Sequence, residues 1–165
     1  MKAQQDVDIK QEQYDKIGGW LLLVAIGLIL TPIRLLVVIV KDLLPVFSGD
    51  AWSRLTTPGA EAYHPLWAPL LLFEVIGNCL FILLPIIIAI FFFQRRQFVP
   101  TLIIILLLSN LVFVAIDYFA ADLIPFIAAQ EDMGSLLELI RVFIASVIWV
   151  PYFLVSKRVK GTFVV

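Results

Sequence analysis

The chain has 165 residues, of which 62% are hydrophobic and 15% charged, and its mean hydropathy is +1.03. Soluble globular domains are close to half apolar and a quarter charged, so this composition indicates a membrane protein. The net charge of −1 argues against a nucleic-acid-binding surface, and one Cys and one His exclude a disulfide framework and a dedicated Cys/His metal site.

Four apolar stretches are long enough to cross a membrane, which takes roughly 20 helical residues. They are continuously apolar, whereas the strands of a membrane barrel alternate and last about ten residues. We therefore predict an all-α fold, a polytopic membrane protein whose four-helix transmembrane bundle is a single domain over residues 17–155. The approximate spans are residues 17–40, 66–93, 98–116 and 136–155, with a polar tail at residues 1–16 and a basic tail at residues 156–165.

The first sixteen residues mix Lys with Asp and Glu, unlike the start of a secretory signal. The apolar run that follows is too long for a cleavable signal, so we expect the first helix to remain as an anchor. Eight of the twelve basic residues fall in the two tails and in the turn at residues 94–97, which four spans place on one side. Because Lys and Arg favour the cytoplasmic side, we expect both termini to be cytoplasmic.

Two segments then lie on the opposite side of the membrane. Residues 41–65 contain Pro, Gly and aromatic residues, a pattern typical of a turn-rich loop at the interface. Residues 117–135 are too short to span and too apolar for a free loop, so we expect a short helix lying on the membrane.

Ionisable residues inside the spans gather in one layer. At a helical rise of about 1.5 Å per residue, they lie about 21 to 28 Å from the cytoplasmic ends of their spans, which places them in the outer leaflet. Such residues are costly in lipid and usually face the bundle interior or a wet cavity. We predict an outer-leaflet polar cluster, open to the outside and bounded by Arg34, Glu74, Asn78, Asp117, Glu138 and Arg141.

The pairing within this cluster can be argued in two ways. Glu138 and Arg141 are i, i+3 neighbours that can pair, which leaves Arg34 to meet Glu74 or Asp117 from neighbouring helices. The alternative is that Arg34, Asp117 and Glu138 are ordinary interface residues, with Arg34 extending to the head groups. For Glu74 with Asn78, a structural network that holds helices together is favoured over a ligand site.

Patterns typical of enzymes are missing. The sequence has no glycine-rich phosphate loop, no GxSxG and no HExxH. His64 is expected at the membrane interface, and Cys79 lies in an apolar span, where a thiol is normally inert. We therefore expect a protein that is not an enzyme, with no catalytic residues, metal or cofactor.

Aromatic and basic residues mark the expected inner interface. Amphipathic rings anchor at the water boundary, where anionic head groups also attract cations. The predicted inner-interface anchors are Trp20, Trp149, Tyr152, Lys157 and Arg158.

Several short runs together resemble the domain-of-unknown-function 2569 family of small bacterial inner-membrane proteins. The resemblance covers nearly the whole chain, and its most specific part is the C-terminal run. It implies a four-helix protein of the bacterial inner (cytoplasmic) membrane and no activity. The runs are Gly18-Gly19-Trp20-Leu21, Tyr63-His64-Pro65-Leu66, Phe73-Glu74 with Gly77-Asn78, and residues 149–160 followed by Thr162-Phe163.

Two functions from different classes fit these observations. The first, which the sequence favours, is a non-enzymatic accessory or structural component of a membrane assembly, which would have a protein partner or self-associate in the membrane. The second is a small solute-binding or transport protein that holds a polar or zwitterionic solute between Arg34 or Arg141 and Glu74. Membrane lipid is a partner in both.

Overall fold

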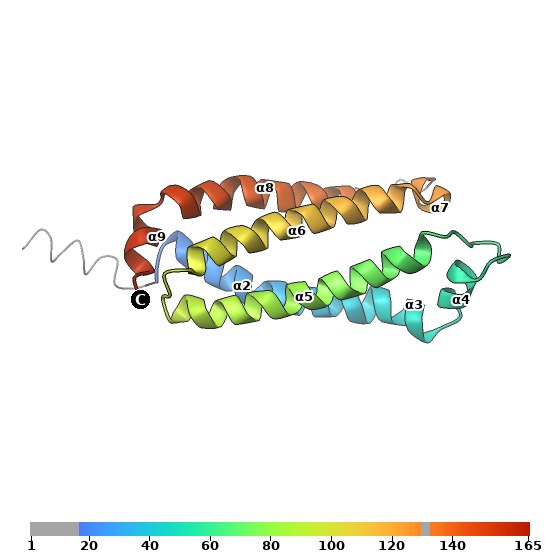
Figure 1. Ribbon diagram of the computed structural model, residues 1–165, viewed down its shortest axis with the longest axis horizontal. Coiled ribbons are helices and arrows are strands. Elements are labelled where there is room, and N and C mark those ends of the chain that lie inside the picture. The colour runs from blue at the N-terminus through green and yellow to red at the C-terminus, as the bar shows by residue number, and fades with distance from the viewer. Residues whose placement is uncertain (1–16, 130–132) are drawn as a thin grey trace, which may run out of the picture.

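The computed structural model of the chain describes residues 17–129 and 133–165. Across these residues the backbone forms helices and turns and no strand, which confirms the predicted all-α fold. Within the described ranges, four helices are long and apolar enough to cross a membrane, so the chain is a multi-pass membrane protein (Figure 1). They are Trp20–Ser48, Trp67–Phe93, Val99–Asp122 and Met133–Val155.

The first span is longer than the prediction, which ended it at residue 40. It comprises α2 (Trp20–Val38), a π-helical segment η1 (Ile39–Leu43) and α3 (Leu44–Ser48). The wider π-turn precedes Pro45, which has no N–H to continue the α-helical ladder and sits in the first turn of α3. Lys41 and Asp42 ended the apolar run but did not end the helix, because backbone hydrogen bonding does not require apolar side chains.

The remaining helices also differ at their ends from the predicted spans. The expected loop at residues 41–65 contains η1, α3 and a further helix, and the expected interfacial helix within residues 117–135 is reduced to four residues. That is because the third span continues through Asp122 instead of ending at residue 116. The bounds are α4 (Ala51–Thr56), α5 (Trp67–Phe93), α6 (Val99–Asp122), α7 (Pro125–Ala128), α8 (Met133–Val155) and α9 (Lys157–Thr162).

The bundle consists of two helix pairs. α2 packs along α5 and α6 packs along α8, and the two pairs are joined through α5 and α6, which follow each other across a tight turn (Figure 1). α2 and α8 pack together far less closely than either packs with its own partner. The seam between α2 and α8 is thus the loosest of the four long-helix seams around the bundle.

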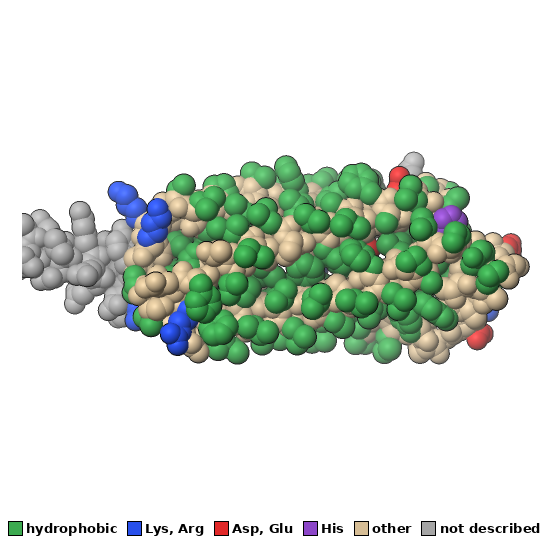
Figure 2. Space-filling model, in the orientation of Figure 1, with side chains coloured by type: hydrophobic (Ala, Val, Ile, Leu, Met, Phe, Trp, Pro, Cys, Tyr) green, Lys and Arg blue, Asp and Glu red, His purple; other side chains and the backbone are tan. Residues whose placement is uncertain are grey.

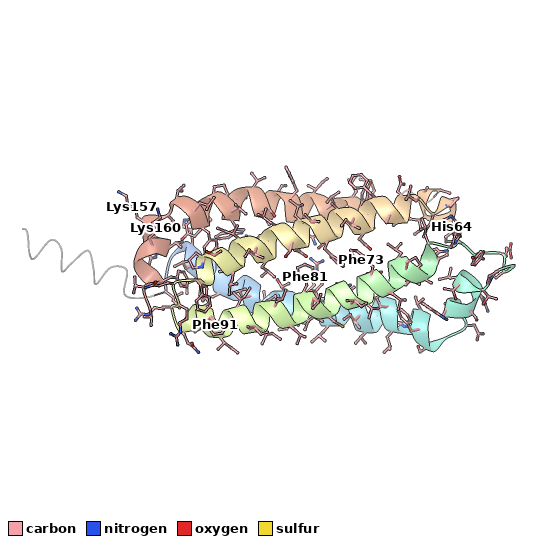
Figure 3. The ribbon with its side chains drawn as sticks, viewed as in Figure 1. His64, Phe73, Phe81, Phe91, Lys157 and Lys160 are labelled. Atoms are coloured by element: carbon pink, nitrogen blue, oxygen red, sulfur yellow. The ribbon has the colours of Figure 1, made fainter. Side chains whose placement is uncertain are left out.

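The apolar core lies in the half of the bundle near the α5–α6 turn. Phe92, Leu21 and Val99 are fully buried there, and Phe163 packs its ring against Phe92 with 5.2 Å between centroids. The same end carries Lys and Arg side chains (Figure 2), among them Lys157 and Lys160 (Figure 3). We call it the basic end, and the opposite end, with α3, α4 and α7, the loop end.

The last residues of the chain close the basic end. Val165 N donates to the Arg95 carbonyl at 3.2 Å, and Gln97 N donates to the Val165 carbonyl at 2.8 Å. α9 begins at Ser156, whose hydroxyl accepts from Val159 N at 3.4 Å, the hydrogen bond of an N-cap. The chain thus returns to the α5–α6 turn and closes the core at the basic end.

Candidate functional site

A polar cavity of about 150 Å³ lies between the four long helices, in the half of the bundle toward the loop end. Figure 2 shows the surface hollowed between α5 and α6 there, with a small acidic (red) patch visible inside the hollow. Five of the six residues of the predicted cluster line this cavity: Arg34, Glu74, Asn78, Asp117 and Glu138. Arg141 does not line it; it lies one turn from Glu138 on α8, with an exposed side chain.

Glu138 binds both arginines of the cluster. Its Oε1 accepts from Arg34 Nη2 at 2.5 Å and its Oε2 accepts from Arg141 Nη1 at 2.6 Å. The predicted Glu138–Arg141 pair is confirmed. The prediction that Arg34 meets Glu74 or Asp117 is wrong, because the long Arg34 side chain reaches across the seam to α8, where Glu138 offers each guanidinium one carboxylate oxygen.

Glu74 and Asp117 are consequently left without a cation. Among the described residues, no ion pair joins either of them to Arg34 or Arg141. The two groups instead line the same cavity from adjacent helices, Glu74 from α5 and Asp117 from α6. The cavity therefore has a carboxyl group on its α5 wall and another on its α6 wall, neither bound to an arginine, and the doubly bound Glu138 on its α8 wall.

Asn78 lies one turn from Glu74 and is 6% exposed. It is one of three buried polar residues in the described part of the chain, with Ser146 and Thr162. Ser146 donates to the Val142 carbonyl at 2.9 Å, whereas the hydrogen bonds of the described residues include none from the Asn78 carboxamide. A buried amide that faces a cavity is suited to hydrogen-bond its occupant.

Gly77 and Phe113 hold the aromatic wall of the cavity in place. A Cβ atom on Gly77 would overlap the Phe113 ring, so the ring enters a space that only glycine leaves open. Its centroid lies 4.8 Å from that of Phe73 and 5.3 Å from that of Phe81, both on α5 (Figure 3). This interlock fixes α6 against α5 beside Glu74 and Asn78.

The sequence-based cluster omitted four cavity residues that carry chemistry: Asn110, Phe113, Tyr118 and Ser135. Asn110 could have been found, because it precedes Asp117 by seven residues and so shares its helix face. The two aromatic residues carried no such signal, since aromatic residues are common throughout the spans. Ser135 lies at the start of α8, three residues before Glu138.

The other residues singled out in the sequence lie elsewhere. His64 is at the loop end (Figure 3), where its Nδ1 accepts from Leu66 N at 3.3 Å, and Cys79 is exposed on α5. The five predicted anchors lie on α2, α8 and α9 near the basic end, where the Trp20 and Trp149 rings are 6.2 Å apart. Among the described residues, Tyr152 Oη and Arg158 Nε are buried with no hydrogen-bond partner.

The cavity walls combine carboxyl groups with aromatic rings. No group of three or more His, Cys, Asp or Glu that could hold a metal occurs in the described ranges. Two carboxylates beside aromatic rings are the usual surroundings of a bound ammonium group, which is attracted by charge and by the ring faces. The Arg34 guanidinium on the facing wall is a donor for an anionic group.

Comparison with known protein families gives a match over nearly the whole chain. The model of a family described as "Protein of unknown function (DUF2569)" matches residues 14–164. No curated protein and no solved structure matches the chain.

Proposed function

Because this chain belongs to the DUF2569 family of membrane proteins of unknown function, we propose a function from the cavity itself. We propose that the protein is a small solute-binding or transport protein whose polar cavity holds a zwitterion with an ammonium group. The ammonium group would lie toward Glu74 and Asp117, and the anionic group toward Arg34.

One observation carries this proposal: both arginines are bound to Glu138, and Glu74 and Asp117 face the cavity without a cation. Polar residues that only held the helices together would be expected to bind one another across the helix seams, as Arg34 and Glu138 do. A ligand ammonium group supplies the missing positive charge. Its anionic group in turn adds a second partner for Arg34, whose side chain is 48% exposed.

The accessory role in a membrane assembly is the competing proposal. It requires that the cluster serve only to hold the bundle and that the lipid-facing surface bind another protein. The uncompensated carboxylates favour solute binding over this role.

The distribution of basic residues supports a proposal for orientation. Arg95, Arg96, Lys157, Arg158 and Lys160 mark the basic end, which by the positive-inside rule faces the cytoplasm. The polar cavity then lies in the outer half of the bilayer, and both termini are cytoplasmic. The family resemblance supports the bacterial inner membrane as the location.

Equilibrium binding of phosphocholine to the purified protein in lipid nanodiscs tests solute binding. We expect saturable binding by the natural chain and loss of that binding in Glu74→Gln, which keeps size and removes charge. Asp122→Asn is the matched control, because it removes a carboxylate at the end of α6 that does not line the cavity.

Two results would contradict the proposal. Unchanged binding in Glu74→Gln would place any phosphocholine site elsewhere. If Glu74→Gln and Asp117→Asn both fail to accumulate while Asp122→Asn accumulates normally, the carboxylates are structural and the accessory role is the better account.

A further inference from the structure

A second cavity, of about 240 Å³, lies between the same four helices on the side of the polar cavity that faces the basic end. Its walls are almost entirely apolar, with Leu23 and Gly27 on α2, Phe81 on α5, Leu107 on α6 and Ala145 on α8. We call it the apolar cavity. Cavities with such walls exclude water and accept apolar molecules.

The two cavities adjoin each other. Asn110 of α6 lines both of them. On α2, Thr31 of the apolar cavity precedes Arg34 of the polar cavity by one turn, and on α5 Phe81 follows Asn78 by one turn. Together they form a continuous site that is charged in one half and apolar in the other.

Size supports a single occupant for both. Pockets for drug-sized ligands begin at roughly 300 Å³, so each cavity alone has room only for a small group. At about 150 and 240 Å³, the two exceed that volume when they are combined. A ligand that fills both must carry a polar head and an apolar tail.

The apolar cavity also opens toward the surrounding lipid. Leu23 and Gly27 line it and yet are exposed, Leu23 by 52%. A Cβ atom built on Gly27 meets nothing within 4 Å, so open space adjoins this turn of α2. The opening lies on α2, which borders the loose seam with α8, and an alkyl chain could enter there directly from the bilayer.

We infer that the ligand is a single-chain zwitterionic amphiphile, with its ammonium-bearing head in the polar cavity and its alkyl tail in the apolar cavity. This inference rests on the proposed function and names the class of its ligand. Asn110, at the junction, is placed to hydrogen-bond the linkage between head and tail.

The test compares the affinity of the protein for a free head group with its affinity for the same head group attached to an alkyl tail. Phosphocholine and hexylphosphocholine, the latter below its micelle-forming concentration, are titrated against the protein in nanodiscs. Gly27→Phe fills the apolar cavity from α2, and Ala145→Leu fills it from α8. Ile29→Phe is the matched control, because Ile29 is 51% exposed and lines neither cavity.

We expect the natural chain to bind hexylphosphocholine more tightly than phosphocholine. Each filling variant should weaken hexylphosphocholine binding about tenfold, the equivalent of removing roughly two methylene groups from apolar surroundings, and leave phosphocholine binding unchanged. The control should change neither. A filling variant that does not accumulate is replaced by the other, which fills the cavity from the opposite wall.

The outcomes separate this inference from the proposed function. Suppose that phosphocholine binds and that Glu74→Gln abolishes this binding. If hexylphosphocholine then binds no more tightly than phosphocholine, or if the filling variants do not weaken its binding, the amphiphile inference is overturned and solute binding stands. If neither probe binds, or Glu74→Gln affects neither, the proposed function fails and this inference fails with it.

Discussion

Arg34 of α2 lies 2.5 Å from Glu138 of α8, in an ion pair that crosses the loosest seam of the bundle. Glu138 also binds Arg141 one turn further along α8, so one carboxylate holds two cations. The pair thus does two things. It connects the α2–α5 pair of helices to the α6–α8 pair, and it leaves Glu74 and Asp117 facing the polar cavity without a cation.

The Arg34–Glu138 pair should stabilise the fold by a measurable coupling energy. Polar interactions between membrane helices average about 0.6 kcal/mol and reach about 1.7 kcal/mol. A double-mutant cycle with Arg34→Gln and Glu138→Gln, followed by unfolding in mixed micelles, should give a value in that range. The exposed Arg54–Asp50 pair, at 3.9 Å, is the control and should give a value near zero. A coupling near zero for Arg34 and Glu138 would contradict their role in joining the helix pairs.

Gly77→Ala should destabilise the bundle, because its Cβ atom would overlap the Phe113 ring. Overpacking of this kind costs about 1 to 3 kcal/mol, measured as the free energy of unfolding. Phe113→Leu should recover part of that loss when it is combined with Gly77→Ala. Gly27→Ala is the matched control, since its methyl group enters open space on α2 and should cause no loss. Equal effects of the two alanines would exclude the proposed interlock.

Phe163→Ala should loosen α9 from the basic end. The side chain is 5% exposed and packs against Phe92, so its removal should cost about 3 kcal/mol, the lower end for a buried Phe. Limited proteolysis should then cut the chain after α8 faster than in the natural protein. Val164→Ala, at an exposed neighbouring position, should not change the rate of cleavage. If Phe163→Ala and Val164→Ala resist proteolysis equally, the packing of Phe163 does not hold α9 against the basic end.

The orientation can be tested with single cysteines in a Cys79→Ser background. We expect Glu61→Cys at the loop end to react with a membrane-impermeant maleimide added to intact cells. Gln94→Cys in the α5–α6 turn should react only after the membrane is permeabilised, because the basic end is expected in the cytoplasm. The reverse pattern would place the polar cavity in the inner half of the bilayer.

The sequence was sufficient to predict the helices and the depth of the polar cluster. Four apolar runs specify four spans, and counting helical rise brought Arg34, Glu74, Asn78, Asp117 and Glu138 to one layer, where the structure has them lining one cavity. The ends of the spans were less predictable. The apolar runs end before Lys41 and Asp117. The helices continue to Ser48 and Asp122, because polar side chains do not interrupt helical hydrogen bonding.

The pairing of charges could not be predicted, because it depends on which faces of the helices meet. Arg34 had three carboxylates at a similar depth, and only the approach of α2 to α8 selects Glu138. The insertion of Phe113 over Gly77 is a matter of shape complementarity, for which a single sequence carries no signal. The apolar cavity was not predicted for the same reason, since a void is a property of packing and not of composition.

The most direct test of ligand binding in the polar cavity is a nuclear Overhauser measurement. The trimethylammonium protons of phosphocholine should show contacts to ring protons of Tyr118, assigned by their disappearance in Tyr118→Phe, and these contacts should vanish in Glu74→Gln. Contacts to Tyr152 at the basic end instead, or Tyr118 contacts that persist in Glu74→Gln, would contradict a site formed by Glu74 and Asp117.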